Sequence, residues 1–495
     1  MVPDSILVEQ AERYDAIQLF SYAAQQTQAG FQIQQSNLPA IIDTCQLVQG
    51  MPLAIILSAS WLTMLTVEEI SSEIKNGIDF LSVEMTDLPQ RQRSIRAVFD
   101  HSWDLLTELE QSVFQQLAVF RGGFTRHAIQ TITDTNLHLL MSLTNKSLIQ
   151  HDKSTRRYYI HELLRQYAED RLLVSDNMYN THHRHATYYL NYLVTHGAHL
   201  KGKQQLNALQ LIEEDYDNIK VAWQWSIDHE QLDMVESGIE SLMLYYQLSS
   251  RVQEGQNIFE ATRAKLQGHT TTVYPRLLVR FNLTTDDADV ILLRLESALE
   301  KAISRADQKE SAYCFVKIAE LHHHHYLNPK DAIHHYESGI QLYRELDERY
   351  YLADALSKLG EAYRLLGNVE KNQVLVQESY RIQLEIDDEL GASQTMRALG
   401  MATFLAGDYA RSLKYCEDAL DIQKRANFIA GQVNNGIYVG IVKYFNGQVQ
   451  EGKQLVEESF YMAEDIGLKS AMGWALASLS TFASVAGDYE LAESL

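Results

Sequence analysis

The stretch Leu356-Ser357-Lys358-Leu359-Gly360-Glu361-Ala362-Tyr363, with Gly367 shortly after it, is one copy of a pattern that returns along the last third of the chain. The later glycine recurs at 40-residue intervals, at positions 367, 407, 447 and 487. Seven residues before each stands Gly360, Gly400, Gly440 or Ser480. Two columns in fixed phase indicate a repeat protein built from helical units.

Each unit has the pattern of a helix, a tight turn and a second helix. Leu356, Leu359 and Tyr363 fall on one face of a helix. The later glycine suits the end of that helix, because glycine adopts positive φ without a steric cost. The earlier glycine costs about 1 kcal/mol in mid-helix, and we expect it to be used for close approach of the second helix.

These residues resemble the tetratricopeptide repeat family: the motif from Leu356 to Tyr363 is similar to its first helix, and Gly407-Asp408-Tyr409 is similar to its turn. An earlier unit runs through residues 319–346 with its register shifted by one. We therefore predict an α–α superhelix over residues 311–495. Because the chain ends within a second helix, we expect this superhelix to be truncated.

In the tetratricopeptide family the first helices line the concave surface, and carrying this over by position predicts a groove for a protein or small-molecule ligand. Its lining would be apolar and aromatic, with two arginines for an acidic group. The predicted residues are Arg364, Arg397, Met401, Phe404, Ile437, Ile441, Tyr444 and Trp474. The alternative is that these side chains pack on neighbouring helices. Alanine at Phe404 and Tyr444 should leave the fold intact if the groove exists.

The first third of the chain divides into two predicted domains. Over residues 1–86 the pattern predicts four helices, at 15–28, 37–48, 51–65 and 67–76, the last with a capping box of Thr66 and Glu69. Over residues 87–180 it predicts helices at 94–106, 108–120 and 137–144. A β-hairpin follows at 147–160, where the pattern changes to period two. Helices followed by a hairpin are the outline of a winged helix.

Residues 12–172 resemble the part of a signal-transducing NTPase of the STAND or NB-ARC kind that follows its nucleotide-binding core. Gly50-Met51-Pro52-Leu53 is similar to the GLPL motif, residues 117–124 resemble the winged-helix stretch of bacterial regulators, and Ile160-His161-Glu162 stands where the family has Met-His-Asp. The resemblance implies that Pro52 lies against the nucleotide base and that His161 contacts the phosphate of ADP. It also implies an upstream nucleotide-binding domain as partner.

A phosphate-binding loop is missing from the sequence. Residues 197–204, Gly-Ala-His-Leu-Lys-Gly-Lys-Gln, fit the glycine and lysine spacing, but Gln204 stands where a hydroxyl for Mg²⁺ is required, and the surroundings are helical. We therefore expect no catalysis and no cofactor. ATP or ADP would bind only if a nucleotide-binding core were supplied.

Charge and composition narrow the class of partner. With 42 Lys and Arg against 65 Asp and Glu, the net charge of −23 disfavours nucleic acids and anionic membranes. The longest apolar stretch, residues 51–65, is 15 residues and too short to span a bilayer. Three widely spaced cysteines fit a reducing compartment, so we expect a cytoplasmic protein.

Two regions carry weaker signals. Residues 181–310 are predicted to be degenerate helical repeats, with a helix at 207–227 and an irregular joint at 270–289. His322 to His325, with His334 and His335, are a candidate metal site. No cysteine falls at ligand spacing, and we expect no metal.

Together these patterns predict a mainly all-α protein: a helical domain, a winged helix with a small hairpin, and a repeat superhelix. The predicted function is a regulatory or sensor segment of a signal-transduction NTPase. The alternatives are a stand-alone scaffold that uses only its repeats and a DNA-binding regulator that uses the winged helix. For the last, residues 87–171 hold 11 basic and 10 acidic residues, which is a weak basis for binding phosphates.

Overall fold

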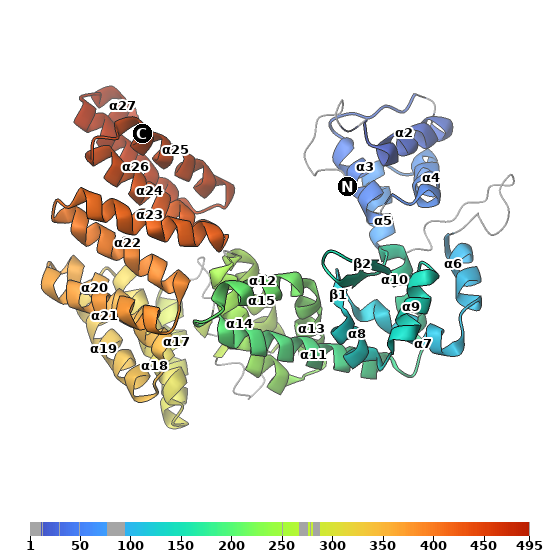
Figure 1. The fold of residues 1–495 in the computed structure, drawn as a ribbon, viewed down its shortest axis with the longest axis horizontal. Helices are drawn as coiled ribbons and strands as arrows, with labels where there is room; N and C mark the ends of the chain where they lie inside the picture. Colours follow the sequence, from blue (N-terminus) through green and yellow to red (C-terminus); the bar gives the residue numbers. More distant parts are fainter. Residues whose placement is uncertain are drawn as a thin grey trace. The chain divides into compact units, whose positions relative to one another are not determined.

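The computed structural model describes the chain except residues 1–10, 12, 29, 49, 77–94, 250, 267–275, 278, 281–287 and 495. The described residues form helices throughout, apart from one small three-stranded sheet (Figure 1). The prediction of a mainly all-α fold is confirmed. Among the described residues no helix combines the length and the apolar character needed to cross a membrane.

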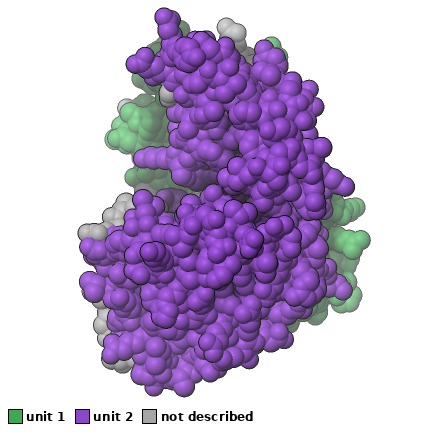
Figure 2. All heavy atoms as spheres, turned by 90° about the vertical axis from the view of Figure 1, so that its left-hand side faces the viewer, with its two compact units in different colours: residues 1–189, 215–225 green, residues 190–214, 226–495 purple. Residues whose placement is uncertain are grey.

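The chain forms two compact units, which Figure 2 colours separately. Unit 1 comprises residues 1–189 and 215–225, and unit 2 comprises residues 190–214 and 226–495.

Unit 1 begins with four helices: α2 (Asp15–Thr27), α3 (Leu38–Leu47), α4 (Pro52–Ser60) and α5 (Val67–Asn76). Helices α2, α3 and α5 lie within one residue of their predicted bounds, whereas the helix predicted at 51–65 ends at Ser60 and is followed by a 3-10 turn at Trp61–Thr63. Gly50, at φ +73°, follows the end of α3, and Pro52 occupies the first turn of α4, where its missing N–H costs nothing. The predicted capping box is present, because the Thr66 N–H donates to Glu69 Oε2 at 2.8 Å and the Glu69 N–H donates back to Thr66 Oγ1.

The next part of unit 1, residues 95–173, is named here the helix–hairpin module. Its helices are α6 (Ile95–Asp104), α7 (Glu108–Gln116), α8 (Arg126–Thr133), α9 (Leu137–Asn145) and α10 (Glu162–Leu173). Its strands are β1 (Phe124–Thr125), β2 (Gln150–Asp152) and β3 (Arg157–Tyr159), antiparallel in the order β1-β3-β2. The predicted hairpin is β2 and β3. The sequence analysis missed β1, because two residues are too short to show a period-two pattern.

After the helix–hairpin module, the described residues form α11 (Met178–His199), α12 (Gln205–Glu214), α13 (Tyr216–Asp228), α14 (Leu232–Leu248) and α15 (Val252–Lys265). The predicted single helix over 207–227 is wrong, because it breaks at Asp215. This aspartate is buried and pairs with Arg157 of β3, with Oδ1 and Nη2 2.6 Å apart. Its carbonyl oxygen accepts from the Ile219 N–H at 3.0 Å, so a new helix, α13, begins at this point. The predicted joint at 270–289 lies mostly outside the described residues.

The repeats of unit 2 follow α17 (Ala288–Ser304) as stacked helix pairs. They are α18 (Gln308–His324) with α19 (Pro329–Glu345), α20 (Arg349–Leu365) with α21 (Val369–Glu385), α22 (Glu389–Leu405) with α23 (Tyr409–Arg425), α24 (Ile429–Phe445) with α25 (Val449–Asp465), and α26 (Lys469–Ala486) with α27 (Tyr489–Ser494). Most of these helices have 17 residues.

Both glycine columns have the roles that the sequence predicted. Gly367, Gly407 and Gly447 end first helices at φ +78°, +82° and +92°. A Cβ at Gly400 would lie 2.4 Å from Cys416 Sγ, and one at Gly440 would lie 2.7 Å from the Gly452 carbonyl oxygen. The mid-helix glycines therefore permit the close packing of each first helix on its second helix.

Candidate functional site

The first helices of consecutive repeats contact one another through a row of side chains, named here the first-helix face. Lys358 of α20 pairs with Glu320 of α18 at 2.6 Å, and the ring centroid of Tyr438 of α24 lies 6.1 Å from that of Trp474 of α26. The face consists of Lys317, Glu320, Asp354, Lys358, Glu361, Arg364, Arg397, Met401, Phe404, Tyr438, Ile441 and Trp474.

The half of this face on α18 and α20 is a network of ion pairs. Glu320 accepts from both Lys317 and Lys358, and Lys358 also pairs with Asp354 at 2.7 Å. Although burial opposes the shift, the two lysines lower the pKa of Glu320 to about 2. Burial likewise opposes the charged form of Lys358, yet Asp354 and Glu320 hold its pKa well above the usual value. Glu320 and Lys358 are therefore both charged at neutral pH, and each is held in an ion pair.

The half on α22, α24 and α26 is apolar and aromatic. Met401, Phe404 and Trp474 are half-buried and pack against a buried cluster that includes Tyr438. At the position of Glu320 and Glu361 in the first two repeats, the next two repeats place Met401 and Ile441. The first-helix face therefore changes from charged to apolar along the superhelix.

The two predicted arginines differ in availability. Arg364 is paired with the carboxylate of Glu361, with Nε and Oε2 2.8 Å apart, on its own helix. Within the described part of the chain, the half-buried guanidinium of Arg397 makes neither a hydrogen bond nor an ion pair. Its charge still contributes to lowering the pKa of Glu361 and opposes the rise that burial causes in the pKa of Tyr438. Arg397 is the cation that remains available beside the apolar half.

Two residues of the predicted groove lie in the core. Ile437 is fully buried. Tyr444 stacks on Phe482 with ring centroids 3.9 Å apart, and its hydroxyl donates to the Phe482 carbonyl oxygen at 2.9 Å. They are not surface residues of the first-helix face, because position in the repeat alone did not reveal which turns the next helix covers.

In unit 1 the structure brings together the two regions expected to contact nucleotide. His161 is the N-cap of α10, where its Nδ1 accepts from the Leu163 N–H at 3.2 Å. Its Nε2 therefore carries the proton and donates to the Val48 carbonyl oxygen at 3.0 Å. Val48 caps α3, four residues before Pro52, which is exposed. Burial lowers the pKa of His161 against the opposing effects of this carbonyl and Glu162, which favours the neutral ring.

The helix that carries His161 is fixed by charge. Arg165 pairs with Glu162 at 2.7 Å and with Glu169 at 2.6 Å, and Arg121 also binds Glu169. The main-chain N–H of Arg121 donates to Asn218 at the start of α13. These pairs position α10, and with it the His161 ring, against the rest of unit 1.

The segment similar to a phosphate-binding loop has another role. Residues up to His199 belong to α11, and Gly202 lies so close to the α21–α22 turn that a Cβ would meet the Ile386 carbonyl oxygen at 2.2 Å. Gln205 donates to Asp388 Oδ1 at 2.8 Å and accepts from the Leu390 N–H at 2.9 Å. This contact, residues 201–205 on 386–390, is named here the clasp.

Asp388 of the clasp gives a pH prediction. Burial raises its pKa to about 6, so the folded state binds more protons than the unfolded state between about pH 4 and 6 and loses stability as pH rises through that window. Asp388→Asn keeps an acceptor for the Gly391 N–H and removes the charge. Urea titrations from pH 4 to 7 should show wild type losing up to about 3 kcal/mol relative to the variant. Parallel profiles for the two proteins would contradict the assignment.

The basic side chains of the hairpin, which a DNA-binding winged helix would use, are only partly exposed. Arg157 is buried in its pair with Asp215, whereas Lys153 and Arg156 are exposed. Helix α9 exposes Leu137 and Met141, at 41% and 54% of their surface. Two exposed basic residues on the hairpin and an apolar exposed surface on α9 are poorly suited to binding phosphates.

The histidine cluster packs around α18 and α19. The rings of His322 and His335 stack 5.5 Å apart, and burial is the first cause of the lowered pKa of His323 and His335. In the portion of the chain that is described, no three His, Cys, Asp or Glu residues are arranged to hold a metal ion.

The sequence analysis overlooked the charged half of the first-helix face and the clasp. The charged half had a signal, because Lys317 and Glu320 recur 41 residues later as Lys358 and Glu361. The clasp had none, since its partners are about 185 residues apart in sequence.

Comparison with known proteins supports the repeat assignment. The family described as Tetratricopeptide repeat matches residues 351–425. A Mycobacterium tuberculosis (strain ATCC 25618 / H37Rv) protein that carries the name HTH-type transcriptional regulator Rv0890c is 24% identical over 436 residues, which cover 85% of this chain and 49% of the relative. The chain thus spans about half the length of the curated relatives it matches.

Solved structures are similar at low identity. A Signal Transduction ATPase with Numerous Domains (STAND) protein with a tetratricopeptide repeat sensor from Pyrococcus horikoshii matches with a TM-score of 0.44 and 15% identity, over 97% of this chain and 71% of that chain. The Rap protein complexed with Competence and Sporulation Factor matches with a TM-score of 0.45 and 13% identity, over 62% and 84%. The match to the Tetratricopeptide repeat family, over residues 351–425, lies at the centre of the superhelix.

Proposed function

We propose that this chain is the sensor and regulatory segment of a signal-transduction NTPase, and that its first-helix face binds a ligand with an acidic group and an apolar body. A short peptide with a free carboxyl terminus has that chemistry. The chain would recognise and relay, and we propose that it does not itself hydrolyse ATP.

One observation carries the proposal: Arg397 lacks an ion-pair partner within the described residues, although it stands between a charged and an apolar surface. Every other cation of the face, namely Lys317, Lys358 and Arg364, is paired. An unpaired, half-buried guanidinium is suited to a carboxylate, and the neighbouring aromatic surface supplies apolar contact area.

The relay would use the helices that connect the two units. Helix α11 is continuous and contributes residues to both units, and the clasp attaches the α11–α12 connection and the first residue of α12 to the α21–α22 turn. In unit 1 the hydrogen bond from His161 to Val48 holds the segment that leads to Pro52. We propose that ligand occupancy changes the orientation of α11 and thereby the strength of this hydrogen bond. A nucleotide-binding core supplied upstream would sense the change.

Binding by the first-helix face is tested with Arg397→Met. The probes are a hexapeptide library with free carboxyl termini and the same library with amidated termini, each selected on the 495-residue chain and quantified by mass spectrometry. Wild type should enrich free-carboxyl peptides, and the variant should bind them about tenfold more weakly, the loss of one charge-assisted contact.

The matched control is Arg411→Met, which removes an exposed arginine from α23 and should not change the selection. No enrichment by wild type, or equal enrichment of amidated peptides, would contradict the proposed function.

A second candidate, DNA binding by the helix–hairpin module, is favoured by the name of the Mycobacterium tuberculosis relative. The buried state of Arg157 and the apolar surface of α9 oppose it. A salt-dependent shift of duplex DNA by the full chain that is lost in Lys153→Ala/Arg156→Ala would favour this candidate.

A further inference from the structure

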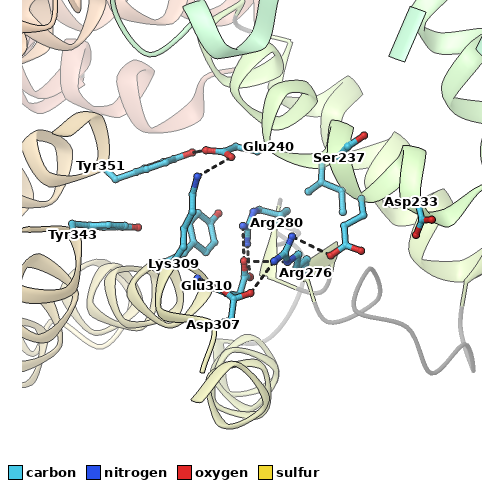
Figure 3. Close-up of a pocket in the computed structure, with 13 residues that line it drawn as sticks. Asp233, Ser237, Glu240, Arg276, Arg280, Asp307, Lys309, Glu310, Tyr343 and Tyr351 are labelled. Carbon is cyan, nitrogen blue, oxygen red and sulfur yellow. Dashed lines mark hydrogen bonds and ion pairs between the residues drawn. The ribbon is translucent and has the colours of Figure 1, made fainter. Parts of the chain in front are cut away.

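Unit 2 contains a cavity with a volume of about 370 Å³. It is separate from the apolar half of the first-helix face, and Figure 3 shows the side chains that line it. One wall is a single face of α14, where Asp233, Glu236, Ser237 and Glu240 stand at helical spacing. The opposite wall holds Arg276, Arg280 and the start of α18, and the lining is completed by Tyr313, Tyr343 and Tyr351.

The basic residues of this cavity are already neutralised. Arg276 pairs with Glu236 at 3.1 Å and with Asp307 at 2.8 Å. Arg280 forms a two-pronged pair with Glu310, at 2.8 and 2.9 Å. An anion that entered would have to displace these carboxylates.

Lys309 is satisfied in the same way, by Glu240 at 3.2 Å and by Glu348 at 2.9 Å. Although burial opposes the shift, Lys201, Tyr351 and Lys309 lower the pKa of Glu240 to about 2, so this carboxylate stays charged at neutral pH. Tyr351 also donates its hydroxyl to Glu240.

The cavity has a surplus of negative charge. Five carboxylates and three cations line it, and 3 − 5 gives a net charge of −2. Asp233, at the edge in Figure 3, has no ion pair or hydrogen bond to any residue that the structure describes. A net negative, concave surface favours organic cations through Coulomb attraction. The rings of Tyr313 and Tyr351 already have the side-chain cations of Arg280 and Lys201 over them, at 3.7 and 5.1 Å.

We propose that this cavity binds a small organic cation with two amino groups, of the diamine class. Two ammonium groups match the net charge of −2, and the volume lies at the small end of ligand pockets, which suits a free small molecule better than a peptide. The site is independent of the peptide-binding function proposed above. The same chemistry occurs in lysine side chains, so the probes must separate the two sources.

The test is calorimetric titration of the full chain with 1,4-diaminobutane, succinate and trilysine. Wild type should bind 1,4-diaminobutane saturably and should bind neither succinate nor trilysine as tightly. Asp233→Lys should weaken diamine binding about tenfold, and raised KCl should weaken it further. The control Glu457→Lys makes the same change in net charge on an exposed site of α25 and should alter the affinity less than about twofold.

Equal losses in the two variants would assign the binding to the overall charge of the chain and overturn the proposal. So would the absence of saturation by the diamine, or tighter binding of succinate or trilysine. Arg397→Met should bind the diamine as wild type does, so the result is separable from the outcome of the peptide selection.

Discussion

Replacing Asp215 by alanine is expected to lower the free energy of unfolding of unit 1 by about 3–5 kcal/mol, because it leaves the buried Arg157 guanidinium without its counter-ion. Both side chains are more than nine-tenths buried, and Asp215 accepts from two guanidinium nitrogens. Arg157 also donates to the Gly123 carbonyl oxygen at 2.6 Å, an acceptor that carries no full charge.

Urea unfolding of the full chain, followed by circular dichroism, measures this loss. The control is Asp43→Ala, which removes the carboxylate of an exposed pair with Lys75 and should cost at most about 1 kcal/mol. Equal, small losses in the two variants would show that the pair at the α12–α13 break contributes nothing to holding unit 1 together.

Tyr444→Ala is expected to cost about 3–5 kcal/mol in the repeats around α24 and α26, as for other large buried aromatics. The substitution removes the stack on Phe482 and the hydrogen bond that the Tyr444 hydroxyl donates to the Phe482 carbonyl oxygen. Phe404→Ala, at a half-buried position of the first-helix face, should cost about 1–2 kcal/mol, since part of its ring is already in water.

Thermal unfolding, with amide exchange over residues 429–486, compares the two variants. If Tyr444→Ala left stability and exchange unchanged, Tyr444 would be a surface residue, as its place in the repeat predicted. If Phe404→Ala were as damaging as Tyr444→Ala, the apolar half of the first-helix face would be core and not a binding surface.

The helices and turns of the repeats could be predicted because their causes are local. A 40-residue spacing of glycines reports turns at positive φ and close helix pairs, and the structure has both. The capping box at Thr66 is equally local and allowed the start of α5 to be predicted.

Which residues are exposed at the sites depends on packing between helices that are far apart in the sequence, and the sequence pattern shows this packing only in part. Position in the repeat predicted that Arg397, Phe404 and Trp474 share a face with Ile437 and Tyr444, but which turns the next helix covers depends on the stacking. Likewise, the break at Asp215 requires Arg157, 58 residues earlier, and no local signal marks it.

The contact between His161 and Val48 in unit 1 could be predicted in part. The resemblance to the STAND family directed attention to Pro52 and His161, and the structure places the His161 ring against Val48, next to the turn that precedes Pro52. Chemical knowledge of a motif can therefore identify two distant segments as neighbours, although the atoms in contact, an imidazole N–H and a main-chain carbonyl, follow only from the coordinates.

Hydrogen exchange of the full chain with and without the tightest free-carboxyl hexapeptide tests the central claim, that the repeats recognise a ligand and relay its presence. We predict slower exchange over α22, α24 and α26 together with changed exchange at the Leu163 amide, which His161 caps. Protection confined to the second helices, with the Leu163 amide unchanged, would contradict both recognition by the first-helix face and the relay.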